Sequence, residues 1–223
     1  MEVLTTIMDW SEVWILIVPM VIYLNKKAQP NFMVPVITYV FLGFFFNLIC
    51  DGMYLLLPLL PEKYHSNTIF YNLHSLSRFC LFISFFLRLN QQDYRLIKKL
   101  LIAFFIINFI IYFIFFDSFF NTQHISSDLM TGEAFFLLFF CMLFYLSLMK
   151  EENSSYKYRK DFWVVTGLSI YMVVNFFLFL FYNPLLDKNA QLAEDIWNVH
   201  NIAYVIFILL ISKALYVSDP DKH

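Results

Sequence analysis

The chain has 223 residues, of which 61% are hydrophobic and only 14% are charged, and 29 are phenylalanine. Soluble domains carry roughly 25% charged residues, and a water-soluble fold of this length cannot bury so much apolar surface. The composition therefore predicts that lipid is the solvent for most of the chain. No polar stretch is long enough for a soluble catalytic domain or a nucleic-acid-binding domain.

Seven apolar segments follow one another, each near the roughly 20 residues that a helix needs to cross the hydrocarbon core. The acidic N-terminal stretch has no basic n-region, so we expect the first segment to be a retained helix and not a cleaved signal peptide. We predict an all-α polytopic membrane protein, a single domain over 1–223, with transmembrane helices at 11–25, 33–57, 68–89, 97–116, 129–149, 162–182 and 196–216.

The positive charges indicate the orientation. The chain has 15 Lys and Arg residues. In alternate connectors twelve of them fall on one side and two, Lys63 and Lys188, on the other, while Arg78 lies within the third segment. Loops on the cytoplasmic side carry the excess of positive charge. We therefore expect the N-terminus outside and the C-terminus in the cytoplasm.

Several polar residues fall inside the predicted spans, where a charged side chain costs roughly 2.5–3.5 kcal/mol on insertion scales. The topology places them in the outer half of the membrane, on five different helices. His74 and Arg78 share one helix face at a spacing of four residues. We predict an outward-facing polar pocket whose ligand-binding residues are Asp51, His74, Arg78, Glu133, Asn175, Trp197 and His200.

Three other interpretations of these residues stay open. A buried Arg78 paired with Asp51 or Glu133 is also what a structural bridge between helices needs, and Glu133 and His200 are near enough to the interface to reach water. His74 and His200 with a carboxylate fit a zinc site, although no paired histidine spacing supports one. We expect no cofactor, and we expect the three cysteines, within apolar runs, to be unpaired.

The stretches FYNLHSLSRFCLFISFF, TGEAFFLLFFCMLFYLSL, DFWVVTGLSIYMVVNFFLFLF and WNVHNIAYVIFILLISKALY carry a resemblance over roughly residues 68–217. Here the chain resembles a group of uncharacterised seven-helix proteins of Bacteroidota-type bacteria, which are related to membrane sensor modules of histidine kinases. The resemblance implies a multi-pass protein of the bacterial cytoplasmic (inner) membrane and a role in signal reception.

A second, weaker resemblance involves LGFFFNLICDG and His74 on the next helix. These residues are similar to the Gly-Asp and His helices of lysoplasmalogenase-like hydrolases and to the ceramidase and adiponectin-receptor superfamily. That superfamily uses a histidine pair on the seventh helix, where this chain has His200 alone. The resemblance implies lipid chemistry, with Asp51 and His74 as an acid/base pair.

Three functions compete at this point. The first is a membrane sensor or receptor-like module that binds a small or lipid-derived ligand in the polar pocket and signals to a partner protein through the loops 88–99 and 150–160. The second is an intramembrane lipid-modifying hydrolase, with or without a metal, whose candidate catalytic residues are Asp51, His74, Glu133 and His200. The third is a small-solute transporter, which requires polar residues to continue toward the cytoplasmic side.

Overall fold

The computed structural model describes residues 8, 10–26, 28–56, 59, 66–89, 94–115, 125–151 and 158–217. All regular structure in these residues is helical, which confirms the predicted all-α class. The seven α-helices are α2 (Ser11–Asn25), α3 (Val34–Leu56), α4 (Thr68–Arg88), α5 (Arg95–Phe115), α6 (Ser127–Leu148), α7 (Lys160–Lys188) and α8 (Ala190–Tyr216), and a 3-10 turn, η1 (Asn31–Met33), precedes α3.

The predicted segments and the helices agree to within a few residues except around 183–195, which was expected to be a polar connector. There α7 continues to Lys188, α8 begins at Ala190, and Asn189 alone separates them. The Asn189 side chain caps α8 by accepting a hydrogen bond from the Leu192 amide at 3.2 Å, which is a strong helix start signal. Hydropathy identifies the apolar part of a helix, so it misses polar turns that extend beyond the hydrocarbon layer.

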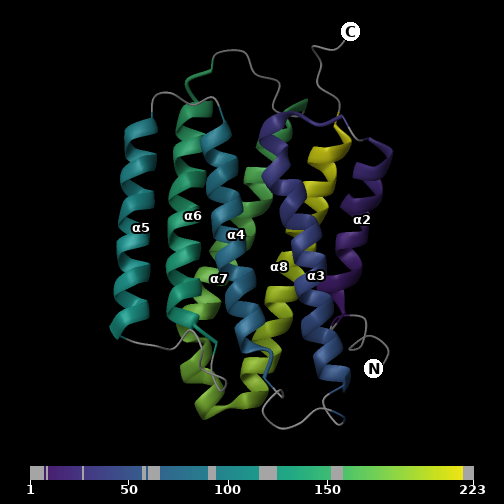
Figure 1. Cartoon of the computed structure of the whole chain (residues 1–223), viewed down its shortest axis with the longest axis vertical. Helices are drawn as coiled ribbons and strands as arrows, with labels where there is room; N and C mark the ends of the chain where they lie inside the picture. Colours follow the sequence, from purple (N-terminus) through teal and green to yellow (C-terminus); the bar gives the residue numbers. More distant parts are fainter. Residues whose placement is uncertain are drawn as a thin grey trace.

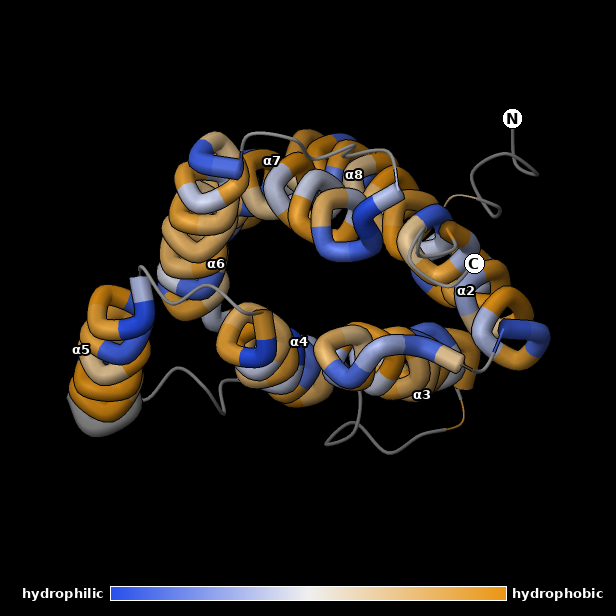
Figure 2. The backbone as a smooth tube through the Cα atoms, turned by 90° about the horizontal axis from the view of Figure 1, so that it is seen from above, coloured by the Kyte–Doolittle hydropathy of each residue, from blue (hydrophilic) through white to orange (hydrophobic). Residues whose placement is uncertain are grey.

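The helices run up and down along one axis (Figure 1). Seen along that axis, α2, α3, α4, α6, α7 and α8 form an elongated ring, and α5 lies outside it beside α6 and α4 (Figure 2). Helix α2 closes this ring by packing against α8. The buried aromatic side chains of Phe79, Phe105 and Phe136 attach α5, with the Phe79 and Phe105 ring centroids 3.6 Å apart.

Five helical stretches are long and apolar enough to cross a membrane: Asn31–Met53, Thr68–Arg88, Ser127–Leu148, Lys160–Lys188 and Gln191–Tyr216. The outward faces of the ring carry large exposed apolar side chains, such as Phe45, Phe177 and Leu209. A lipid bilayer is the environment that such faces require. Within the described residues α2 is a shorter apolar helix, of 15 residues, and α5 is not among the five stretches.

One end of the bundle is rich in lysine and arginine, and several of these side chains donate to main-chain carbonyls at helix ends. Lys26 donates to the Tyr216 carbonyl at 2.8 Å, and Lys160, which is buried, donates to the Ala214 carbonyl at 3.3 Å. Cations near a helix C-terminus interact favourably with its dipole and its unpaired carbonyls. Just before α7, Arg159 donates hydrogen bonds to the Asp161 carboxylate, and these raise the pKa of the Arg159 guanidinium. We call this the basic end.

Candidate functional site

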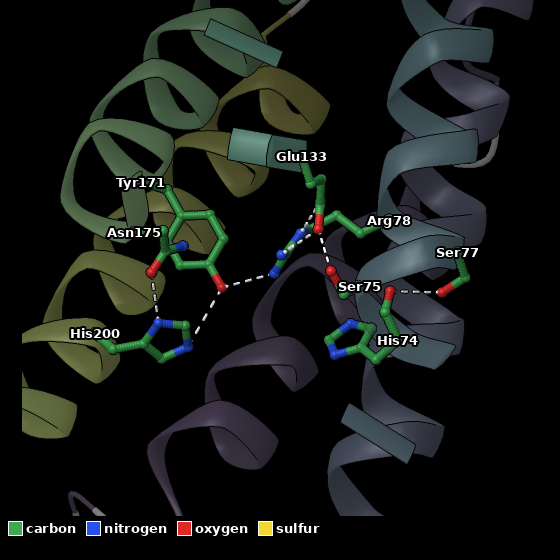
Figure 3. Close-up of polar contacts among 8 residues, drawn as sticks. All are labelled: His74, Ser75, Ser77, Arg78, Glu133, Tyr171, Asn175 and His200. Carbon is green, nitrogen blue, oxygen red and sulfur yellow. Dashed lines mark hydrogen bonds and ion pairs between the residues drawn. The ribbon is translucent and has the colours of Figure 1, made fainter. Parts of the chain in front are cut away.

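A buried ion pair joins α4 to α6 (Figure 3). The Arg78 Nε atom lies 2.7 Å from Glu133 Oε1, and its Nη2 atom lies 2.9 Å from Oε2. Both residues are at least 95% buried. Ser75, one turn before Arg78, also donates a hydrogen bond to Glu133. Two parallel N–H···O bonds between a guanidinium and a carboxylate make a strong and geometrically specific contact, so the Arg78 charge is already neutralised.

The network continues from Arg78 to α7 and α8. Arg78 Nη1 donates to the Tyr171 hydroxyl at 3.0 Å, and that hydroxyl lies 3.4 Å from His200 Nε2. The other ring nitrogen of His200 lies 2.6 Å from Asn175 Oδ1 (Figure 3). The Trp197 ring stacks on the histidine, with 4.9 Å between ring centroids. Tyr171 therefore connects the ion pair to the histidine, and His200 bridges the seam between α7 and α8.

Helix α2 reaches the same histidine. Glu12 Oε1 lies 3.1 Å from His200 Nε2, and both residues are largely buried. Glu12 Oε1 makes no hydrogen bond within the described part of the chain. The link between α2 and α8 is therefore the close approach of a carboxylate to an imidazole.

The remaining side of the site comes from α3. Asn47 donates to the Glu12 carbonyl at 3.1 Å and to the Tyr204 hydroxyl at 3.4 Å. His74 is stacked between the rings of Tyr39 and Phe46, at 5.8 and 5.6 Å between centroids. Its buried Nε2 atom has no hydrogen-bond partner in the described part of the chain. It is a polar atom available to a ligand.

These side chains surround a small enclosed cavity of about 20 Å³. A buried water needs roughly 10–15 Å³ of this kind of volume and two to four polar partners, so the cavity fits a water molecule and nothing much larger. Its walls are formed by Glu12, Tyr71, His74, Ser75, Arg78, Met130, Tyr171, Phe179, Trp197, His200 and Tyr204.

Below the cavity, toward the basic end, the core is apolar. Tyr39 and Phe82 pack with ring centroids 5.1 Å apart, and Phe207 lies against both. Phe85 and Phe86 continue this layer and are fully buried. A transport path would need polar groups here, so the aromatic layer weighs against the transporter interpretation.

The structure brings together most of the residues that the sequence singled out. His74, Arg78, Glu133, Trp197 and His200 lie in one network or line one cavity, with Asn175 bonded to His200. Asp51 is the exception: it does not line the cavity, and Arg78 pairs with Glu133 instead of with it.

Sequence reasoning missed several members of the network, among them Glu12, Tyr171 and Ser75. Glu12 was interpreted as part of an acidic flank because it lies near the start of the first apolar segment. Tyr171 stands in an apolar run in which a phenol resembles an ordinary core aromatic. Ser75 lies between His74 and Arg78, and only its three-residue spacing from Arg78 indicates a shared face.

The geometry of the site does not support the catalytic and metal-binding interpretations. Among the described residues, no group of three or more His, Cys, Asp or Glu side chains could hold a metal ion. The proposed acid/base pair of Asp51 and His74 is not assembled at the cavity, because only His74 lines it. Glu133 is committed to Arg78 and Ser75.

No family model, curated protein or solved structure matches the chain. The fold and the site define a class: an all-helical, membrane-type bundle with an ionic and hydrogen-bonded network buried between its helices. Function is inferred below from that network.

Proposed function

We propose that the chain is a seven-span sensor or receptor-like module of a bacterial cytoplasmic membrane, with its N-terminus outside and its basic end in the cytoplasm. The observation that supports this is the continuous polar network that joins α4, α6, α7, α8 and α2 around one cavity. In this proposal α2 and α5 also cross the membrane, and the excess of positive charge at the basic end gives the orientation.

Such a network suits signal reception because its members depend on one another. A small or lipid-derived ligand that binds Arg78 must compete with Glu133, and one that binds His200 must compete with Glu12 or Asn175. Since the cavity has room for only about one water molecule, a larger ligand enters only if these pairs separate. Ligand binding would thus favour a different arrangement of helices, which is what a receptor needs.

The test measures whether a substitution in the network changes the distance between helices at the basic end. Spin labels at Leu24→Cys and Met149→Cys, both exposed and near the ends of α2 and α6, report the distance between these helices. The background lacks Cys50, Cys80 and Cys141. We expect Glu133→Gln to shift the distance distribution in lipid nanodiscs, and Leu146→Ala, on the exposed face of α6, to leave it unchanged.

An identical distribution in folded Glu133→Gln protein contradicts the proposal, as does turnover of lipid by the purified protein that His74→Ala abolishes. Orientation is tested separately with a membrane-impermeant thiol reagent on intact cells. We expect it to label Leu192→Cys, at the start of α8, and not Met149→Cys.

A further inference from the structure

A second and much larger hollow lies on the outside of the α7–α8 seam. It has a volume of about 610 Å³, within the 300–1,000 Å³ range of small-molecule sites. On α7 its wall runs from Val174 to Lys188, and on α8 it is formed by Ile196 and Val199. Every lining residue except Lys188 is apolar. We call this hollow the α7–α8 groove.

The length of the groove matches one leaflet of a bilayer. The 29 residues of α7 extend for about 43 Å at 1.5 Å per residue, close to the roughly 40–45 Å of a bilayer with its headgroups. Val174 lies at the middle of this helix and Lys188 is its last residue. The groove therefore runs from the level of the midplane to the level of the lipid headgroups.

The groove has a local cause in the sequence. Pro184 lies inside α7 and lines the groove. Proline cannot donate the helical hydrogen bond and its ring pushes on the preceding turn, so it bends or loosens a helix. The sequence before it, from Val174 to Phe181, supplies apolar side chains at three- and four-residue spacing on one face, which is what an acyl chain contacts.

The positive charge of Lys188 indicates which kind of molecule fits the groove. Lys188 is exposed at the headgroup end of the groove, and its side-chain ammonium makes no ion pair or hydrogen bond within the described part of the chain. An apolar channel one leaflet long with a free ammonium at its polar end complements a phospholipid, with one acyl chain in the groove and the phosphate at Lys188. We propose that the α7–α8 groove is a binding site for a single bilayer phospholipid.

The site is adjacent to the buried network. Val174 and Val199 line the groove, and their chain neighbours Asn175 and His200 make the hydrogen bond that bridges the two helices on the inner side. Leu178 is shared between the groove and a small apolar cluster that also contains Trp197. A bound acyl chain therefore supports the seam that holds His200 in place. The proposal rests on α7 and α8 lying in a bilayer, as proposed above, and does not depend on signalling.

The experiment is native mass spectrometry of the purified full chain in a non-ionic detergent, titrated with dioleoyl phosphatidylethanolamine or phosphatidylglycerol. We expect saturable binding of one phospholipid. Dioleoylglycerol, which has the chains without the phosphate, should bind about tenfold more weakly, a difference of about 1.4 kcal/mol.

Two variants with matched controls test the two halves of the site. Lys188→Gln should weaken phospholipid binding about tenfold, equivalent to about 1.4 kcal/mol, whereas Lys213→Gln, a cation exposed near the other end of α8, should not. Val199→Trp should block the groove, whereas Leu146→Trp, on the exposed face of α6, should not. Thermal melts of all four show that they are folded.

Binding that rises without saturation, or that is the same for Lys188→Gln and Lys213→Gln, overturns the proposal, because it is the behaviour of ordinary surface lipid. Recovery of the wild-type chain outside the membrane fraction would instead refute the membrane assignment on which both proposals rest. The spin-label distances remain an independent test of signalling.

Discussion

Arg78 and Glu133 face each other from α4 and α6 through two parallel hydrogen bonds of 2.7 and 2.9 Å, buried from solvent. Removal of one member of such a pair leaves a buried charge without compensation. Replacement of both by apolar residues of similar volume is often neutral. The pair therefore fixes which helices lie together more than it stabilises the fold.

The first prediction follows from that asymmetry. Arg78→Met and Glu133→Leu should each lower the free energy of unfolding by about 3–5 kcal/mol, and the double variant should lose much less than their sum. Thermal unfolding in detergent, followed by near-ultraviolet circular dichroism, measures the three values. Additive losses would show that the two side chains act independently, contrary to the geometry.

The second prediction concerns the Tyr171 hydroxyl, which accepts a hydrogen bond from the Arg78 guanidinium at 3.0 Å. Tyr171→Phe keeps the ring and should cost about 1.5–3 kcal/mol, the range for a hydrogen bond to a charged group. Tyr145→Phe is the matched control, because its hydroxyl lies 3.2 Å from the neutral Thr166 hydroxyl. That variant should cost about 0.5–1.5 kcal/mol. Chemical denaturation of both variants in the same detergent measures the two losses of unfolding free energy. A larger loss in Tyr145→Phe than in Tyr171→Phe would contradict the prediction.

The third prediction uses two glycines. A Cβ atom on Gly167 would lie 3.0 Å from Leu210 Cβ and 3.2 Å from the Phe207 carbonyl, whereas nothing lies within 4 Å of one on Gly132. Gly167→Ala should force α7 away from α8 and cost about 1–3 kcal/mol, while Gly132→Ala, inside a helix, should gain about 0.5–1 kcal/mol. Relative to wild type, we expect the melting temperature to fall in Gly167→Ala and to rise in Gly132→Ala. A higher melting temperature in Gly167→Ala would rule out the close contact.

The fourth prediction tests the contact between Glu12 and His200, whose Oε1 and Nε2 atoms lie 3.1 Å apart. His200→Ala leaves Glu12 and Asn175 buried without this partner and should cost about 1–3 kcal/mol for each stranded group. Adding Glu12→Gln should recover part of the loss, because a neutral amide is cheaper to bury than a carboxylate. Unfolding free energies of the single and double variants give the coupling. If Glu12→Gln deepens the loss, removal of His200 does not strand the Glu12 carboxylate.

The helices were predictable from the sequence because the segments in lipid are continuous apolar runs, and hydropathy measures that property directly. The proximity of several site residues was also predicted: His74 and His200 line one cavity with Arg78, which pairs with Glu133. Rotation about each helix axis was not, because lipid-facing and core-facing positions are both apolar here. That is why Asp51 was grouped with the site, and why Tyr171 was not recognised.

The network also depends on the two most distant parts of the chain, since α2 packs on α8 and the bond from Lys26 to the Tyr216 carbonyl spans 190 residues. During synthesis α2 is made before α8. Glu12 therefore lacks its contact with His200 until α8 has been made, and contacts this far apart in sequence form slowly. Truncation before α8 would remove that contact and leave the ring open between α2 and α7.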